Sequence, residues 1–170
     1  MADNSEFGGL LRGIVIDNND PLKMGRLKIR IQAAYGSQPV DNLPWAFPCF
    51  PYGGNSEMCM YAIPENGAGV WVMFQSKDGQ PDTTYPVWLG VWQAQAEVLS
   101  EIEGASADAH HYKELKTTSG HYILFCDKPH EEFIELRHKS GSYILMDKDG
   151  NVEIHAEKNM KLTAQRIDLN

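Results

Sequence analysis

The residues of this 170-residue chain that could support chemistry are histidines, carboxylates and cysteines. His110 and His111 lie between Asp108 and Glu114, and both imidazole and carboxylate are ordinary metal ligands. Two adjacent histidines in a polar segment rarely face the same ion. We therefore expect no metal site at this cluster.

Acidic side chains are frequent in the C-terminal third and could in principle form acid–base pairs: Glu131, Glu132, Glu135, Asp147, Asp149 and Glu153. General acid–base catalysis needs a pocket that perturbs pKa values, and these carboxylates sit among short apolar segments with no pocket-forming loop. A solvated face is the expected arrangement. There is also no GxSxG, no HExxH and no phosphate-binding loop, so we predict no catalytic residue, no cofactor and no enzyme.

The cysteines are Cys49, Cys59 and Cys126, an odd number without a CxxC pair. This pattern favours free, buried thiols over a disulfide framework or a zinc site.

The net charge of −8 opposes nonspecific binding to nucleic acid or to anionic membranes. One basic stretch, Arg26, Lys28 and Arg30, with Tyr35 and Trp45 nearby, matches what a nucleic-acid-binding OB-fold could present. Because the patch is small, we expect it to be a solvated strand face or a protein docking surface, and no nucleic-acid partner. The sequence has no apolar leader and no run of about 20 apolar residues, which favours a cytosolic chain.

The elements that must position these residues read as β-structure throughout. Residues 13–17 and 26–31 form an expected hairpin, in which Leu27, Ile29 and Ile31 alternate with basic residues. Two further strands are expected at residues 69–74 and 87–92, separated by turn residues. We assign residues 1–95 to one domain.

Residues 38–54 hold four prolines, so we expect a long ordered loop there and neither a helix nor a central strand. Its aromatic residues are Trp45, Phe47, Phe50 and Tyr52. They form either a protein interface or a cover for the open end of a barrel, and the sequence does not distinguish these.

Residues 96–115 are rich in Ala, Glu and Ser and are expected to be a linker or a short helix. In residues 116–170, apolar residues recur in i, i+2 pairs: Ile123/Phe125, Ile134/Leu136, Ile144/Met146, Val152/Ile154, Met160/Leu162 and Ile167/Leu169. Each pair indicates a very short strand followed by a turn, and such strands cannot bury their apolar side alone. We therefore predict an oligomer with these pairs directed inward.

A repeated phrase opens this region, SGHYILF from Ser119 and SGSYILM from Ser140. In each copy Ser-Gly favours the turn and Tyr-Ile-Leu favours the strand. Tyr122 and Tyr143 should therefore occupy equivalent strand positions.

The N-terminal part resembles the OB-fold domain of central spike proteins of contractile phage tails and of valine-glycine repeat proteins of type VI secretion. The resemblance rests on Asp20-Pro21, Gly25-Arg26 and an alternating strand, followed by Pro44-Trp45. Its remaining positions are Pro64, Gly69, Phe74, Pro86 and Gly90. Residues 116–170 resemble the start of the trimeric stalk of those spikes.

This resemblance implies an all-β fold, with an N-terminal OB-fold barrel followed by a C-terminal trimeric β-helix or β-prism stalk. It also implies a structural spike that joins a baseplate hub through the OB domain and pierces the target cell envelope. The expected location is a virion tail baseplate or an equivalent injection particle, assembled in the host cytoplasm. The alternative is a nucleic-acid-binding OB module with an oligomerising tail.

Two departures from the larger spikes limit what is carried over. Residues 96–115 are too few for an inserted lysozyme domain, so cell-wall cleavage is not expected. The last residues, AQRIDLN, lack the His-x-His iron motif of some spike tips, which favours a separate PAAR-type tip protein at this end.

Two sets of residues are therefore predicted to act in assembly. The trimer core of the stalk is predicted to comprise Ile144, Met146, Val152, Ile154, Met160, Leu162, Ile167 and Leu169. A hub-docking surface is predicted at Arg26, Lys28, Arg30, Trp45, Phe47 and Phe50.

Overall fold

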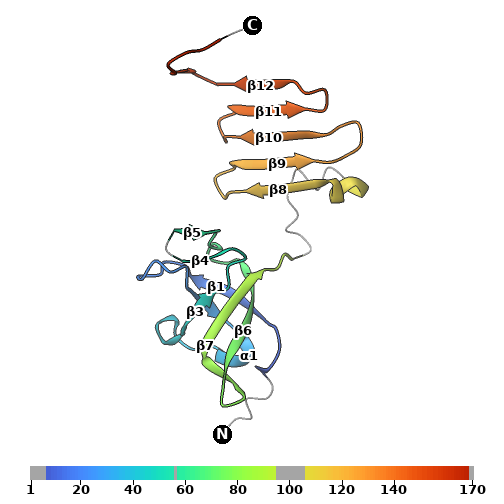
Figure 1. The fold of residues 1–170 in the computed structure, drawn as a ribbon. Coiled ribbons are helices and arrows are strands. Elements are labelled where there is room, and N and C mark those ends of the chain that lie inside the picture. Colours follow the sequence, from blue (N-terminus) through green and yellow to red (C-terminus); the bar gives the residue numbers. More distant parts are fainter. Residues whose placement is uncertain (1–6, 56, 95–105, 169–170) are drawn as a thin grey trace. The chain divides into compact units, whose positions relative to one another are not determined.

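The computed structural model describes residues 7–55, 57–94 and 106–168, and the chain divides into two compact units, residues 1–97 and 98–170 (Figure 1). Strands dominate both units, as the sequence predicts.

The first unit is a closed barrel of five strands in the order β1-β2-β3-β7-β6. The bounds of its strands are Leu11–Asp17 (β1), Leu27–Arg30 (β2), Trp45–Pro48 (β3), Gly69–Lys77 (β6) and Gln80–Val91 (β7). The hairpin expected near the N-terminus is confirmed by the antiparallel pairing of β1 with β2. The two later strands are confirmed as the antiparallel pair β6 and β7.

The barrel core follows from the alternation of apolar residues along these strands. Leu27, Ile29 and Ile31 are at most 1% exposed, and they meet Val70 and Val72 from β6 in one buried cluster. Side chains at alternate strand positions point to one face, so the period-two pattern places all of them inside the closed sheet. This interior supplies most of the hydrophobic stabilisation of the unit.

Strand β3 corrects the prediction that residues 38–54 are loop throughout. Ala46 pairs with Leu27 of β2, and Phe47 pairs with Val87 of β7, so β3 is the strand that connects the two sides of the barrel. The prolines permit this because Pro44 precedes the strand and Pro48 is its last residue. At a strand end, a missing amide donor costs little.

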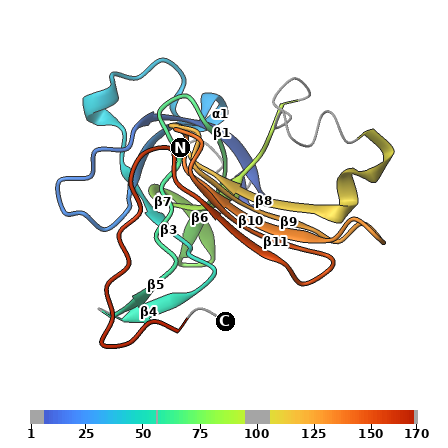
Figure 2. The same ribbon diagram turned by 90° about the horizontal axis from the view of Figure 1, so that it is seen from above.

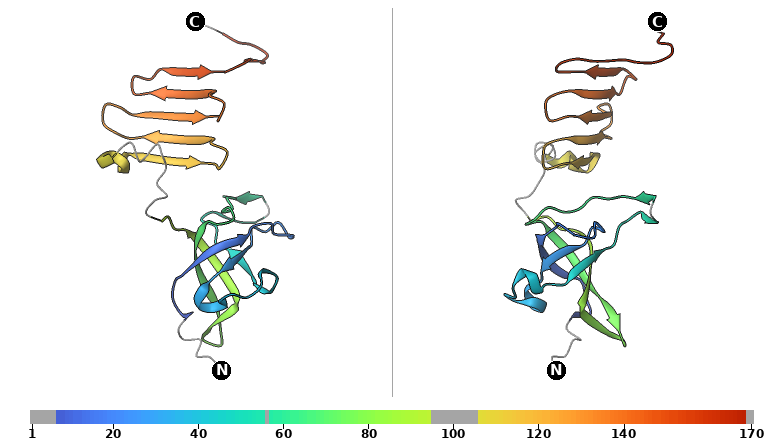
Figure 3. Two further views of the ribbon diagram at one scale, coloured as in Figure 1. Left: turned by 180° about the vertical axis from the view of Figure 1, so that it is seen from behind. Right: turned by 90° about the vertical axis from the view of Figure 1, so that its left-hand side faces the viewer.

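Short elements fill the connections of the barrel. Helix α1 covers Gln32–Tyr35, a 3-10 turn covers Val40–Asn42, and an antiparallel hairpin is formed by β4 (Gly53–Asn55) and β5 (Met58–Cys59). Figure 3 shows this hairpin reaching away from the barrel strands. In the described part of the chain, no helix is long and apolar enough to cross a bilayer.

The second unit is an antiparallel meander of five strands in the order β12-β11-β10-β9-β8, preceded by a 3-10 turn at Ser106–His111. Its strands are Tyr112–Lys116 (β8), Tyr122–Cys126 (β9), Phe133–Arg137 (β10), Tyr143–Asp147 (β11) and Val152–His155 (β12). Figure 2 shows these strands from above, lying over one another with a slight twist. The sheet includes β8, and the first four residues of this strand, 112–115, lie before residue 116, where the stalk is predicted to begin.

The repeated phrase has the geometric meaning that the sequence predicts. Tyr122 opens β9 and Tyr143 opens β11, and each pairs with Arg137 of the strand between them. Gly120 and Gly141 make the preceding turns with φ of +89° and +104°, values that glycine adopts without strain. The equivalence of the two tyrosines is confirmed.

The strand rhythm does not continue through residues 156–168. The pair Met160/Leu162 and residue Ile167 were expected in further strands, but this segment carries none. A strand needs a neighbour for its backbone hydrogen bonds, and β12 is the edge of the sheet within one chain. Leu169 lies outside the described residues.

Candidate assembly surfaces

One face of the meander is made of apolar side chains that point to solvent. We call this set the apolar face: Leu115, Ile123, Phe125, Ile134, Leu136, Ile144, Met146, Val152 and Ile154. Their exposed fractions lie between 36% for Ile144 and 61% for Val152. The single chain therefore leaves this whole side of the sheet uncovered.

The strand register arranges these side chains in two columns. One column runs Phe125, Ile134, Met146 and Val152, each directly opposite the next across the sheet. The second runs Leu115, Ile123, Leu136, Ile144 and Ile154. Monomeric soluble proteins rarely expose a contiguous apolar surface of this kind, so it marks an interaction site.

The apolar face contains Ile144, Met146, Val152 and Ile154 of the predicted trimer core. Met160, Leu162 and Ile167 are also exposed, by 49%, 63% and 49%, but they lie outside the sheet. The predicted core set omits the residues of β8, β9 and β10. The apolar residues of β9 and β10 show the same i, i+2 spacing in the sequence. Leu115 of β8 has no apolar residue two positions away.

The opposite face carries a ladder of alternating cations and aromatic rings along one column: Lys116, Tyr122, Arg137, Tyr143 and His155. The Lys116 ammonium lies 6.0 Å from the Tyr122 ring centroid, and the Arg137 guanidinium lies 4.5 Å from that of Tyr143. The Tyr143 and His155 rings stack at 5.2 Å. Cation–π contacts therefore connect neighbouring strands along this column.

Carboxylates close this polar network within the sheet. Glu135 is only 7% exposed, accepts a 3.0 Å hydrogen bond from the Tyr122 hydroxyl and pairs with the Arg137 guanidinium. Burial, followed by the nearby Glu135, raises the pKa of Tyr122 above its usual value. The Tyr143 hydroxyl donates to Glu153, and this hydrogen bond raises the pKa of Tyr143. Glu135 and Glu153 therefore both have partners within the sheet.

The remaining carboxylates of the acidic set act in turns and ion pairs. Asp147 accepts hydrogen bonds from the amides of Asp149 and Asn151 in the turn after β11, and its pKa is lowered mainly by Asn151. Glu131 pairs with Lys128 at 3.0 Å, and Asp149 pairs with Lys148 at 2.7 Å. Glu132 is exposed. Apart from Glu132, the carboxylates of this set therefore lie in turns, ion pairs or hydrogen bonds.

The histidine cluster is organised by stacking and ion pairing. The rings of His110 and His111 lie 3.9 Å apart between centroids, and Asp108 pairs with Lys128 at 3.3 Å. Among the described residues, no group of three or more His, Cys, Asp and Glu side chains is arranged to hold a metal.

The cysteines are free thiols, as predicted, but their burial was predicted wrongly for two of them. Cys126 is buried in the meander, whereas Cys49 and Cys59 are exposed. Both lie in connections outside the barrel strands, and the local sequence does not indicate that they are exposed.

The basic residues of β2 are engaged by their own chain. The Lys28 ammonium donates to the carbonyls of Val40 and Asp41 at 2.9 and 3.1 Å, and Lys28 is only 8% exposed. The Arg30 guanidinium donates to the carbonyls of Gly36 and Gln38. The expectation of a solvated face is therefore wrong for Lys28, because the loop over β2 brings carbonyl oxygens onto it.

The aromatic residues near this strand are also occupied. The Trp45 ring lies 5.4 Å from both the Arg26 guanidinium and the Lys28 ammonium. Tyr35 is 8% exposed, its hydroxyl donates to Thr83 at 2.7 Å, and burial raises its pKa. Stacking of nucleic-acid bases requires a free ring face, so the geometry does not support a nucleic-acid site here.

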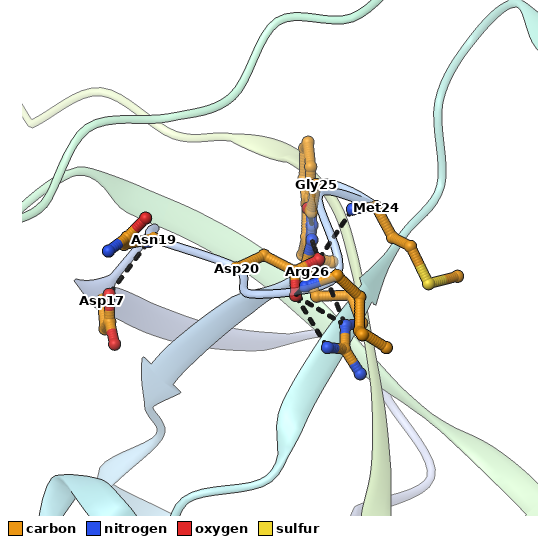
Figure 4. A network of polar contacts seen from close by, with 8 residues as sticks. Asp17, Asn19, Asp20, Met24, Gly25 and Arg26 are labelled. Atoms are coloured by element: carbon orange, nitrogen blue, oxygen red, sulfur yellow. Dashed lines mark hydrogen bonds and ion pairs between the residues drawn. The ribbon is translucent and has the colours of Figure 1, made fainter.

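The loop before β2 is held by a single buried carboxylate (Figure 4). Asp20 accepts hydrogen bonds from the amides of Leu22, Met24 and Arg26 and a bidentate pair from the Arg26 guanidinium, the closest at 2.7 Å. The Arg26 side chain, followed by these amides, lowers the pKa of Asp20 well below its usual value. Leu22 and Met24 remain 63% and 46% exposed on this braced loop.

The aromatic residues of the proline-rich segment divide between the two roles that the sequence left open. Phe50 packs edge-on against Trp88 at 5.6 Å and so covers the barrel core. Phe47 and Tyr52 are 36% and 62% exposed, and they are free to contact another molecule.

Comparison with known families gives one match in the barrel unit. Residues 11–92 match the model of a family described as the type VI secretion system/phage-baseplate injector OB domain. No curated protein matches the chain. The matched segment begins with β1 and ends one residue after β7, so it coincides with the closed barrel.

Proposed function

We propose that the chain is the central spike of a contractile baseplate, because residues 11–92 match the injector OB-domain family of type VI secretion systems and phage baseplates. The single observation that carries this proposal is the uncovered apolar face in a chain whose other unit is a family-matched OB barrel. The family has a structural role in the baseplate. A spike additionally needs a stalk and a way to form it from several chains.

The stalk forms when three chains bring their apolar faces together around one axis. Each meander presents two columns of apolar residues on one side and the polar ladder on the other. Association with the apolar faces inward removes these side chains from water and leaves the polar ladders outside. Three narrow sheets then enclose a prism, and the number three rests on the resemblance to spike stalks.

Residues 156–168 extend this stalk beyond β12. Met160 and Leu162 follow the pair Val152/Ile154 by eight residues, and Ile167 follows Met160 by seven. Within the described part of the chain, these three residues lie in no strand. In a trimer, the edges of adjacent sheets supply the missing backbone partners. We therefore include these residues, with Leu169, in the proposed trimer core.

The barrel is the proposed point of attachment to the baseplate hub. Arg26, Lys28 and Arg30 contribute by shaping this surface, since their charged groups are bonded within the chain. Exposed Phe47 and neighbouring Trp45 remain as contacts for the hub, whereas Phe50, also predicted there, packs on the barrel core. At the other end we propose a PAAR-type tip protein on the stalk.

The proposed action is mechanical. A trimeric stalk without free sheet edges is stiff enough to transmit contraction of a tail sheath to the target cell envelope. This action takes place in a virion tail baseplate or an equivalent injection particle, assembled in the host cytoplasm. It needs no catalytic residue.

Negative-stain imaging of the purified full chain tests this proposal. We expect a slender rod attached to a three-lobed head, because three barrels precede one joint stalk. Compact particles with the dimensions of one 19.1 kDa chain would contradict the spike.

A titration with single-stranded oligonucleotides separates this function from the nucleic-acid-binding alternative. Because the cations of β2 are engaged and the chain is acidic, we expect no binding up to high micromolar protein. Salt-sensitive binding in the low micromolar range would favour the alternative.

A further inference from the structure

The barrel unit contains an apolar pocket that the proposed stalk does not use. Its volume is about 530 Å³, and residues that line it include Cys49, Phe50, Ala62, Trp88, Leu89 and Val91. The indole nitrogen of Trp88 donates to the Gly25 carbonyl at 3.0 Å, so the polar atom of the pocket's largest residue is already satisfied. The pocket is therefore suited to apolar side chains.

The same unit carries a projection with matching chemistry. We call residues 52–61, which include β4 and β5, the arm (Figure 3). Tyr52 and Met58 are 62% and 45% exposed and touch through a 3.5 Å contact between hydroxyl and sulfur. The Met60 amide donates to the Tyr52 carbonyl at 3.1 Å, which holds the two sides of the arm together.

Glycine fixes the shape of the arm. Gly53 has φ of +133°, and a Cβ at this position would lie 2.7 Å from the Met58 carbonyl oxygen. Only glycine allows the two strands to approach this closely.

We propose that the arm of one copy inserts Tyr52 and Met58 into the apolar pocket of the next copy, so that three arms and three pockets close a ring. Met60 lines the pocket of its own chain, which leaves the outer part of the arm to project toward a neighbour. The outer part of one copy's arm in the pocket of the next copy is a head-to-tail contact, and a threefold axis closes such contacts. Methionine adapts well to an irregular apolar surface.

The choice of a second copy as the occupant follows from the apolar face, and it rests on the proposed trimeric spike. When stalks associate, the barrels covalently joined to them reach a high effective concentration. A contact that is too weak to form between free barrels can then form within the trimer. The stalk and the ring would be separate interfaces of one trimer.

Native thiols provide a direct test. Cys59 follows Met58 in the arm and Cys49 lines the pocket, and both are exposed and free. We use three samples of the full chain: Cys49→Ala, Cys59→Ala, and the two variants mixed by reversible unfolding and refolding. Each sample is oxidised with copper phenanthroline or treated with a short bismaleimide, and its mass before treatment is measured by light scattering.

We expect a crosslinked dimer on denaturing gels from the mixed sample and none from either variant alone, because only the mixture pairs a Cys49 with a Cys59 of another copy. The unsubstituted chain should give crosslinked species up to the trimer. Crosslinking in Cys49→Ala alone would mean that arms meet arms and would overturn the proposal.

A trimeric mass without crosslinks in the mixture would also overturn the arm contact, while leaving the spike intact. A monomeric mass would overturn both. As a second measurement, Met58→Glu should abolish crosslinking of the otherwise unsubstituted chain without changing its mass. Met73→Glu, at a barrel residue with similar exposure of 41%, should leave crosslinking unchanged.

Discussion

At the scale of single residues, Asp20 organises the loop between β1 and β2. Its side chain is 3% exposed, and it accepts bonds from three main-chain amides and from Arg26. Lys23 in this loop adopts φ of +56°, a conformation that costs energy for a residue with a Cβ. The hydrogen bonds to Asp20 offset this cost and define the conformation that presents Leu22 and Met24.

We expect Asp20→Ala to lower the free energy of unfolding of the barrel by about 3 to 5 kcal/mol, because it leaves the largely buried Arg26 uncompensated. Asp41→Ala, at an exposed carboxylate, should change it by less than about 0.5 kcal/mol. Urea unfolding followed by tryptophan fluorescence measures this, since all four tryptophans lie in the barrel segment. Equal free energies of unfolding for Asp20→Ala and the unsubstituted chain would contradict the stabilising role of Asp20.

The contribution of Asp20 to the free energy of unfolding should change with pH in a defined direction. The folded-state pKa of Asp20 is lowered, so its contribution is complete above the unfolded-state value of about 3.9 and is lost as the pH falls toward the folded-state value. The stability difference between the unsubstituted chain and Asp20→Asn should therefore narrow below a pH of about 3.9. Unfolding free energies measured at intervals between pH 6 and about 2 test this; a difference that widens on acidification would contradict it.

At the scale of elements, the meander is a sheet with two chemically different faces. The polar ladder links neighbouring strands through Tyr122, Arg137 and Tyr143, whereas the apolar face has only its own side chains for contact. Alternation along each strand predicts the apolar face well, but the opposite face is chemically mixed, because Leu124 and Leu145 lie on it next to Glu135. The β1–β2 and β6–β7 hairpins were predictable for the same reason.

Other elements could not be predicted from local pattern. β3 is a four-residue strand next to two prolines, and its partner Val87 lies far along the chain, so only the closed barrel stabilises it as a strand. The burial of Lys28 depends on carbonyls of Val40 and Asp41, whose position is set by tertiary structure. The apolar rhythm of residues 160–167 predicts strands, but strand formation also requires a neighbour.

The contacts of the polar ladder should contribute to the stability of the meander. Arg137→Met should lower the free energy of unfolding by about 1 to 3 kcal/mol, because it leaves the buried carboxylate of Glu135 without its cation. Glu135→Leu/Arg137→Met should recover much of this loss, since an apolar residue between Leu124 and Leu145 needs no partner charge. Thermal unfolding followed by circular dichroism compares these variants with Lys139→Met. A double variant less stable than Arg137→Met would contradict the proposed balance.

The apolar face is the proposed interface between copies, and charged substitutions on it should prevent association. Leu136 and Ile144 are directly paired across β10 and β11, and Leu136→Asp/Ile144→Asp would place two carboxylates inside the proposed interface. We expect this variant to sediment as a monomer, because charge burial in an apolar interface is strongly unfavourable. The matched control Met73→Asp/Tyr85→Asp alters two exposed apolar barrel residues and should remain oligomeric. Identical sedimentation of both variants would exclude this face as the interface.

At the scale of the whole molecule, the chain joins a family-matched barrel to a sheet that is incomplete as a single copy. The barrel buries its apolar residues within one closed sheet, whereas the meander leaves its apolar face to solvent. The proposed association of several chains would cover the apolar face without a change of fold. The proposed spike follows from that requirement together with the family of the barrel.

The most direct test of this account is the absolute mass of the purified full chain, measured by light scattering after size-exclusion chromatography at micromolar concentration. Three copies of the 19.1 kDa chain predict about 57 kDa across the peak. A uniform peak at the mass of one chain would contradict the trimeric spike.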